Sequence, residues 1–300
     1  MNKTAESQFF GASCLYNKVS KYFTEVPTDQ YDLLKNKLLE KLLLYATKNE
    51  QQQVRLIQRK LNSTLAKLAL YLIEDQWENC IVDMIQTIPN CYNSDSSSAS
   101  GHETIKNDVN RVRLQLIGIL IDLFTLLPEE YATLTNLSKP KRTQIHSKLK
   151  KNFYLIKVYL LNLFNELTNG GEKLMNRTLG TGAASASLDA VLIENGIKCL
   201  NSWVEFGVPF DEMQPFFEFL FISIYHEPLF ETSAECLTSL FISEENLKFT
   251  NSLFKYTSRV LLLRDLLASY VQNKDTVSFT FLFFFLVKFE SFQFFLMISQ

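Results

Sequence analysis

The stretch that decides the fold runs from residue 6 to residue 31: Glu-Ser-Gln-Phe-Phe-Gly-Ala-Ser-Cys-Leu-Tyr-Asn-Lys-Val-Ser-Lys-Tyr-Phe-Thr-Glu-Val-Pro-Thr-Asp-Gln-Tyr. Its first part carries apolar residues at roughly helical spacing, which predicts a helix with one buried face: Phe10, Leu15, Val19 and Phe23. Val26 precedes Pro27, and a residue before proline disfavours the helical conformation, so the chain should turn here. Thr28 is suited to cap a second helix. The stretch therefore predicts a helical hairpin.

Three small residues, Gly11, Ala12 and Ser13, line one side of the first predicted helix. Small side chains allow a neighbouring helix to approach closely, so we expect another helix against this side. Because the helix begins almost at Met1, we expect the hairpin to be the end of a stack of hairpins or a section through one.

Further apolar stripes with helical spacing follow in pairs, at intervals of roughly 40 to 50 residues. Two small-polar loops, near residues 91–108 and 169–187, lengthen some intervals. This spacing is typical of HEAT or armadillo units, each of which buries its apolar face only against its neighbours. The sequence thus predicts an all-α fold, a HEAT-repeat α-solenoid of about five to six helical hairpins over residues 5–276. A compact all-α bundle is the alternative, less favoured because no single helix could touch all the others.

Residues 277–300 differ from the rest, since they hold nine of the 25 phenylalanines and show no clean period. A membrane anchor needs about 20 largely uncharged apolar residues, and Lys288 and Glu290 interrupt the run. A buried helix is a second interpretation, although consecutive phenylalanines are poor helix formers. We favour a third hypothesis, that a T-rich intron encodes this tail. A transcript that codes continuously past Thr276, with no spliced alternative, would contradict it.

Composition limits the classes of function. The net charge of -2 argues against a nucleic-acid surface made by net charge. Five scattered cysteines predict free or buried thiols, with neither a disulfide framework nor a zinc site. The three histidines lie far apart in the sequence, and no secretory signal is visible at the amino end. We therefore expect no metal, no cofactor and no insertion into a membrane.

No arrangement of residues predicts catalysis, so we expect a protein that is not an enzyme. Gly180-Thr-Gly182 lacks the third glycine and the preceding strand of a phosphate-binding loop. Acidic pairs fall at predicted helix ends, where capping and solvation explain them better than acid–base catalysis: Glu129-Glu130, Asp211-Glu212 and Glu244-Glu245. Trp77 and Trp203 sit in apolar stripes and are expected in the core.

A basic segment begins at Lys139-Pro-Lys-Arg142 and continues through Lys148, Lys150 and Lys151. Lys139-Pro-Lys-Arg142 resembles a short basic targeting motif, although such runs are usually solvated loops. Two further interpretations remain open for the basic segment as a whole. They can meet an acidic partner, or they can form the solvated side of a helix.

Several stretches, in order, resemble one family. They are Glu-Ser-Gln-Phe-Phe-Gly-Ala-Ser from residue 6, Leu-Leu-Pro-Glu-Glu-Tyr from residue 126, Lys-Cys-Leu-Asn-Ser-Trp-Val-Glu-Phe-Gly-Val-Pro from residue 198, and Leu-Phe-Glu-Thr-Ser-Ala-Glu-Cys-Leu from residue 229. The chain from about residue 5 to residue 275 is similar to the amino-terminal part of the karyopherin-β (importin-β) family, of the importin-13 and transportin-3 type. The resemblance implies a right-handed superhelical arch of HEAT repeats that begins at the family's second repeat. The first repeat and those after about the sixth are expected to be missing.

What the resemblance implies is a nuclear transport receptor that shuttles between nucleus and cytoplasm. Its partners would be cargo proteins, the GTPase Ran in its GTP state and Phe-Gly nucleoporins. The first helix of each repeat would line the convex side, and the second would line the concave side that contacts Ran and cargo. The family's first repeat, which is expected to be missing here, supplies part of the Ran site. A HEAT-repeat scaffold without Ran dependence is the alternative.

Two predicted helices, from Thr28 to Tyr45 and from Gln76 to Ile88, match the family's Ran-facing helices. Their residues outside the core are the candidate Ran contacts: Asp32, Lys35, Lys37, Glu78 and Asp83. For each residue the simpler explanation, which we weigh more heavily, is an ordinary solvated charge on a helix.

Overall fold

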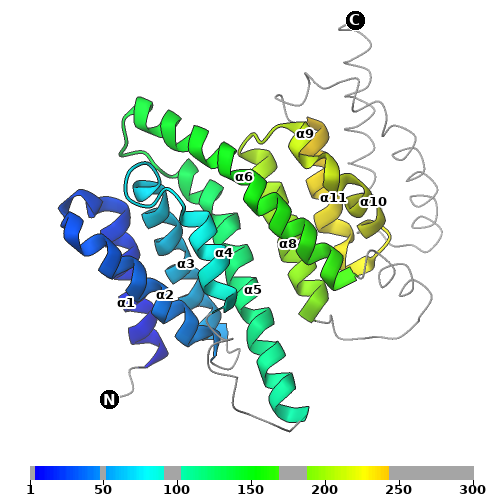
Figure 1. Cartoon of the computed structure of the whole chain (residues 1–300), viewed down its shortest axis with the longest axis horizontal. Coiled ribbons are helices and arrows are strands. Elements are labelled where there is room, and N and C mark those ends of the chain that lie inside the picture. The colour runs from blue at the N-terminus through cyan, green and yellow to red at the C-terminus, as the bar shows by residue number, and fades with distance from the viewer. Residues whose placement is uncertain (1–3, 48–51, 91–102, 169–187, 243–300) are drawn as a thin grey trace, which may run out of the picture. The chain divides into compact units, whose positions relative to one another are not determined.

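The computed structural model describes residues 4–47, 52–90, 103–168 and 188–242, and every regular element in these ranges is helical (Figure 1). The α-helices are α1 (Ala5–Tyr22), α2 (Tyr31–Ala46), α3 (Gln52–Leu72), α4 (Cys80–Asn90), α5 (Glu103–Ala132), α6 (Lys139–Thr168), α8 (Leu188–Glu205), α9 (Phe210–Met213), α10 (Phe217–Ser223) and α11 (Glu227–Ile242). Three single 3-10 turns are η1 (Phe23–Glu25), η2 (Thr28–Gln30) and η3 (Gln214–Phe216). The predicted all-α HEAT-repeat fold is confirmed.

The chain divides into two compact units, residues 1–156 and residues 157–300. In the first unit, α3 packs against α1, α2 and α5, while α2 and α4 also pack against α5. Every residue from 61 to 70 of α3 is buried, as expected for a helix with neighbours on several sides. α5 carries apolar residues on nearly all sides between Val112 and Leu127, which predicts burial on most sides, and most of its residues there are buried. These two helices form the core of the unit.

The opening hairpin is largely as predicted. α1 begins at Ala5, and the Thr4 side chain caps it by accepting a hydrogen bond from the Ser7 amide (3.3 Å). Val26 is extended (φ -78°, ψ 122°), as a residue before proline should be. The prediction that Thr28 caps the second helix is wrong. Thr28 lies within η2, whose preceding residue is Pro27, and η2 has no side-chain cap.

The apolar stripe of α1 is only partly buried. Val19 is fully buried, whereas Phe10 is 70% exposed and was wrongly assigned to the buried face. Of the three small residues, Ala12 is buried, but a Cβ on Gly11 would meet no atom within 4 Å. Within the described residues, no helix approaches closely at Gly11.

Residues 73–79 form a turn that delays the next helix. The amides of Asp75, Gln76 and Trp77 all donate to the Leu72 carbonyl, at 3.3, 3.0 and 2.8 Å. This turn ends α3, so α4 begins at Cys80 and the predicted start at Gln76 is wrong. Glu78 consequently lies in a turn and not on a helix.

α5 departs from its prediction at both ends. It begins at Glu103, inside the loop predicted for 91–108. It also continues through Pro128 to Ala132, so Pro128 and the acidic pair do not end it. A proline in the last turn deprives the helix of only one backbone hydrogen bond, which the remaining bonds of a long helix tolerate.

In the second unit, α8 and α11 pack together. Gly207 follows α8 with φ of 89°, a conformation that suits a glycine cap, and the Val208 amide donates to the Trp203 carbonyl (3.1 Å). After Pro209 the chain forms α9, η3 and α10 in place of one continuous helix, with the interruption at Pro215. Their phenylalanines join the core together with Trp203: Phe210, Phe216, Phe217 and Phe221.

Gly196 on α8 lies at a close contact between helices in this unit. A Cβ there would stand 2.5 Å from a ring carbon of Phe164 on α6. Phe164 in turn stacks on Phe219, with ring centroids 4.4 Å apart. Glycine therefore lets α6 and α8 approach here without displacing the Phe164 ring.

Four cysteines are free within the described residues: Cys14 is exposed, and Cys80, Cys199 and Cys236 are buried. Burial raises the pKa of the Cys80 thiol to about 12 and also raises the pKa of Cys236. Cys91, the loop 169–187, the stripe from Tyr256 to Tyr270 and the tail 277–300 lie outside the described residues. No helix in the described part of the chain is long and apolar enough to cross a membrane.

Candidate partner-binding face

Trp77 contacts two of the candidate residues, Lys35 and Asp83, and Lys35 in turn pairs with a third, Asp32. Lys35 Nζ lies 5.2 Å from the ring centroid and 2.6 Å from Asp32 Oδ1. The indole Nε1 donates to Asp83 Oδ2 at 2.7 Å. Since Trp77 is itself buried, as predicted, it holds residues of α2 and α4 in a fixed relation.

Glu78 belongs to a second contact that reaches α6. Lys148 Nζ lies 2.5 Å from Glu78 Oε1 and donates to the Glu74 carbonyl at 3.4 Å. The hydrogen bond from Lys148, and then its positive charge, lowers the pKa of the Glu78 carboxyl. One lysine of the predicted basic segment is therefore committed to the turn at residues 73–79.

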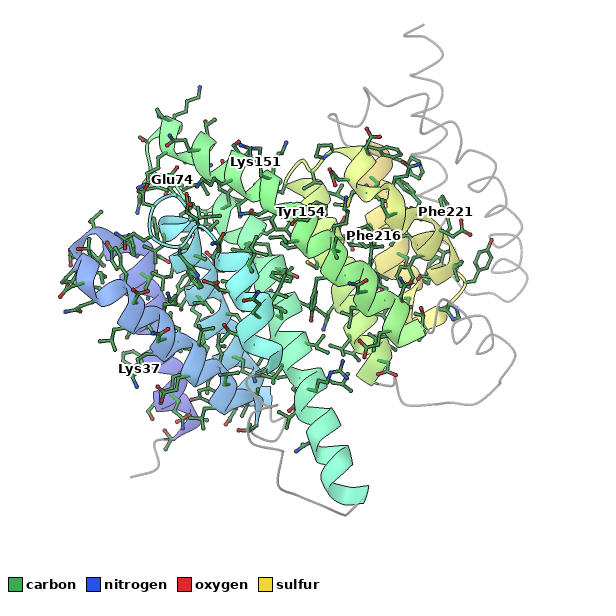
Figure 2. The ribbon with its side chains drawn as sticks, in the orientation of Figure 1. Lys37, Glu74, Lys151, Tyr154, Phe216 and Phe221 are labelled. Atoms are coloured by element: carbon green, nitrogen blue, oxygen red, sulfur yellow. The ribbon has the colours of Figure 1, made fainter. Side chains whose placement is uncertain are left out.

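Lys37 stands apart from these contacts. It pairs with Glu40 (2.7 Å), one helical turn away on the exposed side of α2. Figure 2 shows Lys37 on α2, well separated from Glu74 in the turn before α4. Asp32, Lys35 and Asp83 are thus linked through Trp77, and Glu78 follows Trp77 directly in the sequence. Lys37 lies apart from them on α2. We call Asp32, Lys35, Trp77, Glu78 and Asp83 the Trp77 face.

All five candidate residues have a partner within the chain, which shapes what they can do. Exposed ion pairs are worth about 0 to 1 kcal/mol, so a binding partner can exchange them at little cost. Asp83 is different, because its bond to the indole anchors Trp77 and is part of the fold. Ion pairing and cation–π contact are the chemistry of this face, and both suit recognition of a protein surface.

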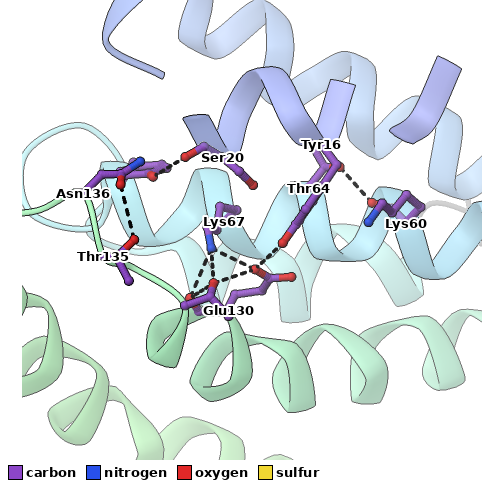
Figure 3. Close-up of polar contacts among 10 residues, drawn as sticks. Tyr16, Ser20, Lys60, Thr64, Lys67, Glu130, Thr135 and Asn136 are labelled. Atoms are coloured by element: carbon purple, nitrogen blue, oxygen red, sulfur yellow. Dashed lines mark hydrogen bonds and ion pairs between the residues drawn. The ribbon is translucent and has the colours of Figure 1, made fainter. Parts of the chain in front are cut away.

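Sequence analysis missed a buried polar cluster that joins three helices (Figure 3). Lys67 Nζ of α3 lies 3.0 Å from Glu130 Oε2 of α5, and the two side chains are 3% and 9% exposed. The Tyr16 hydroxyl of α1 donates to the same carboxylate oxygen at 3.0 Å. Lys67 also donates to the Thr133 hydroxyl. We call Tyr16, Lys67, Glu130 and Thr133 the buried cluster.

The interpretation of Glu130 as a solvated helix-end charge is wrong, because Lys67 accounts for its burial. Lys60 adds a cation–π contact 3.8 Å from the Tyr16 ring centroid, and burial raises the pKa of the Tyr16 hydroxyl. One signal in the sequence could have revealed this cluster. Lys67 is a lone charge within the apolar run from Leu65 to Leu72, and such a charge requires a buried partner.

A second polar contact joins α3 and α5. Asn62, which is 1% exposed, donates to Asp122 Oδ2 at 2.6 Å. Burial raises the pKa of the Asp122 carboxyl, although the hydrogen bond from Asn62 and the charge of Arg59 oppose this shift. No group of three or more His, Cys, Asp or Glu residues in the described ranges could hold a metal ion.

Comparison with known proteins identifies the family. Residues 54–237, more than half of the chain, match the model of the family described as Exportin 1-like protein. The chain belongs to this family. The match begins in α3 and extends into α11, so it includes Glu78 and Asp83 but not the candidate residues of α2.

The chain is similar to Importin-13 of Bos taurus, with 26% identity over 274 residues, which are 91% of this chain and 24% of that protein. Importin-13 of Homo sapiens is 25% identical over the same length and the same shares. Importin-13 homolog A of Dictyostelium discoideum is 21% identical over 206 residues, 69% of this chain and 16% of that protein. The chain thus spans about a quarter of the length of its mammalian relatives.

Proposed function

We propose that the chain is part of a non-enzymatic nuclear transport receptor that binds Ran in its GTP state and a cargo protein, and that shuttles between nucleus and cytoplasm. The observation that carries this proposal is family membership together with similarity to Importin-13 over 91% of the chain. Packed helices that contact mainly their neighbours suit the task, because such a stack can wrap different partners along one surface.

The Trp77 face is the proposed place of Ran contact in this part of the receptor. Its charges come from α2, the turn at residues 73–79 and the first turn of α4, and Trp77 holds them together. Lys37 presents its charge on a separate exposed patch of α2 and is assigned a contact with Ran or cargo there. Phe-Gly nucleoporins complete the proposed set of partners.

If Ran and an import cargo bind one receptor, each must weaken the binding of the other by the same factor. The proposal can therefore be tested by comparing two binding measurements. Cargo release by Ran-GTP and Ran release by cargo are two measurements of one coupling free energy.

A HEAT-repeat scaffold without Ran dependence is the second candidate. The pairing of all five candidate residues within the chain favours it, since side chains already satisfied need no partner. The two functions differ in one property, which is sensitivity to the nucleotide on Ran.

The test is retention of the chain on immobilised Ran loaded with GTP or with GDP. We expect retention on the GTP form only, and a loss of retention in the variants Lys35→Glu and Glu78→Lys. Lys21→Glu is the control, because Lys21 is an exposed lysine on α1, remote in sequence from the face. Equal retention on both forms would favour the scaffold, and no retention on either would contradict Ran binding by this part of the receptor.

A further inference from the structure

The amino-terminal half of α6 carries a positive charge that the contacts described so far do not use. No Asp or Glu occurs between residues 131 and 165, whereas residues 139–151 hold six Lys and Arg residues. The positive end of the helix dipole lies at the same place, so the basic residues there repel it. A sequence selected only for stability would place acidic residues in this first turn, and α6 has none.

Part of this charge is directed to solvent. Ile145, Leu149 and Phe153 are buried and define the inner side of α6. At 100° per residue, Lys151 and Tyr154 fall on the opposite side, and Lys139 and Lys150 fall on its flank, so the four lie within about a third of the circumference. We call these four residues the α6 basic face. Lys148 is not included, because its ammonium group pairs with the Glu78 carboxylate.

Two lysines of the α6 basic face, Lys139 and Lys151, are exposed and have no ion-pair partner among the described residues. Tyr154 is 56% exposed and lies next to Lys151 on the helix (Figure 2). Aromatic residues are enriched at protein interfaces, and here an exposed ring stands beside a lysine that has no ion-pair partner among the described residues.

We propose that the α6 basic face binds an acidic segment of a partner protein, with an apolar residue of that segment seated on Tyr154. Charge complementarity carries the choice of partner. The face extends about 22 Å along α6, from Lys139 to Tyr154, which an extended peptide of about seven residues spans.

A nucleic acid is the less suitable polyanion. Asp75 and Glu78 are exposed in the turn next to Lys148, and they would repel a phosphate backbone that continued past the helix. A short peptide avoids this repulsion, because its charge ends where the α6 basic face ends.

The test is a fluorescence anisotropy titration of the whole chain with labelled seven-residue peptides. One peptide consists of Glu with a central Leu, the second replaces the Leu by Gly, and the third replaces each Glu by Lys. Single-stranded DNA of equal charge is the competing probe. We expect the first peptide to bind most tightly and its affinity to fall as salt screens the charges.

Lys151→Glu should weaken binding of the first peptide about three- to tenfold, the range expected when one exposed charge contact is lost or reversed. Tyr154→Ala should remove the preference for Leu over Gly at the centre of the peptide. Lys21→Glu, the matched control on α1, should leave the affinity unchanged. Circular dichroism of each variant verifies that its helices are retained.

The proposal is overturned if no acidic peptide binds, if Lys21→Glu weakens binding as much as Lys151→Glu, or if DNA binds more tightly than the peptides. The titration contains no Ran and no nucleotide. A failure here therefore leaves the proposed transport function intact, and a failure to retain Ran leaves this inference intact.

Discussion

Lysine meets a carboxylate in two contrasting places in the first unit. In the buried cluster, Lys67 and Glu130 are almost fully removed from water and share Tyr16 and Thr133. At the Trp77 face, the Asp32 carboxylate paired with Lys35 is 83% exposed. Both contacts are ion pairs between a lysine and a carboxylate, but they differ in exposure to water. The fold depends on the buried pair, because neither charge there can be solvated alone. The exposed carboxylate of the second pair can exchange its partner.

Removing one member of the buried Lys67–Glu130 pair should cause the largest loss of stability. Lys67→Ala leaves the Glu130 carboxylate buried without a counter-charge, and we expect a loss of about 3 to 5 kcal/mol in the free energy of unfolding. Urea denaturation followed by circular dichroism measures it. A loss below about 1 kcal/mol would show that water reaches the site.

The control replaces both charges, as Lys67→Met with Glu130→Leu. Removing a buried pair as a whole leaves no unpaired charge, so this double variant should recover most of the stability lost by Lys67→Ala.

An uncharged substitution in the second unit should have an effect on stability of intermediate size. Gly196→Ala places a Cβ against the Phe164 ring, and overpacking costs about 1 to 3 kcal/mol. Alanine regains about 1 kcal/mol of helix propensity, so we expect a net loss of up to ~2 kcal/mol. Adding Phe164→Leu should reduce this loss, and a stabilised Gly196→Ala variant would contradict the close contact.

Asp122 extends the comparison to a half-buried carboxylate that has Asn62 and the charge of Arg59 near it but no lysine. Asp122→Asn keeps an oxygen that accepts from Asn62 and removes the charge, so we expect a gain of up to ~1 kcal/mol at neutral pH. The folded-state pKa of Asp122 is raised, so its contribution to stability is present in acid and is lost as the pH rises through that pKa.

The advantage of Asp122→Asn over the original chain should therefore appear at neutral pH and vanish in acid. Denaturation at a series of pH values measures this dependence. An advantage that does not change with pH would mean that the charge of Asp122 is not the cause.

The smallest effect on stability is expected at a second exposed pair, Glu78 with Lys148. Glu78→Gln removes the charge that Lys148 contacts, and we expect no measurable change in the urea midpoint because water replaces the lost contact. Retention on Ran-GTP should nevertheless decrease. A clear loss of stability would place Glu78 with the buried cluster, as a residue of the fold.

Periodicity predicted the helices well because apolar spacing reports directly on which side of a helix is buried. Gly207 was also predictable, since only a residue that accepts a positive φ suits that cap. The errors have local causes that spacing does not show. The Leu72 carbonyl accepts from three amides and delays α4. Phe10 has the right spacing, but no helix of the described ranges covers it.

The candidate site was harder to predict than the fold. A family resemblance names the helices that face a partner, but the partners of Lys35, Glu78 and Asp83 depend on Trp77 and Lys148, which lie far away in the sequence or in another element. Buried charges are the exception. A lysine between leucines requires an acid, and the acid at Glu130 could have been sought among the predicted helix ends.

The unequal burial of the thiols gives an experimental advantage. Thiolates are the species that react with maleimides, and burial keeps Cys80, Cys199 and Cys236 from reagent while Cys14 is open to it. With Cys91 replaced by serine, a single dye can be placed on α1 without disturbing the core. Fluorescence from Cys14 would then report partner binding at the first hairpin directly, one molecule at a time.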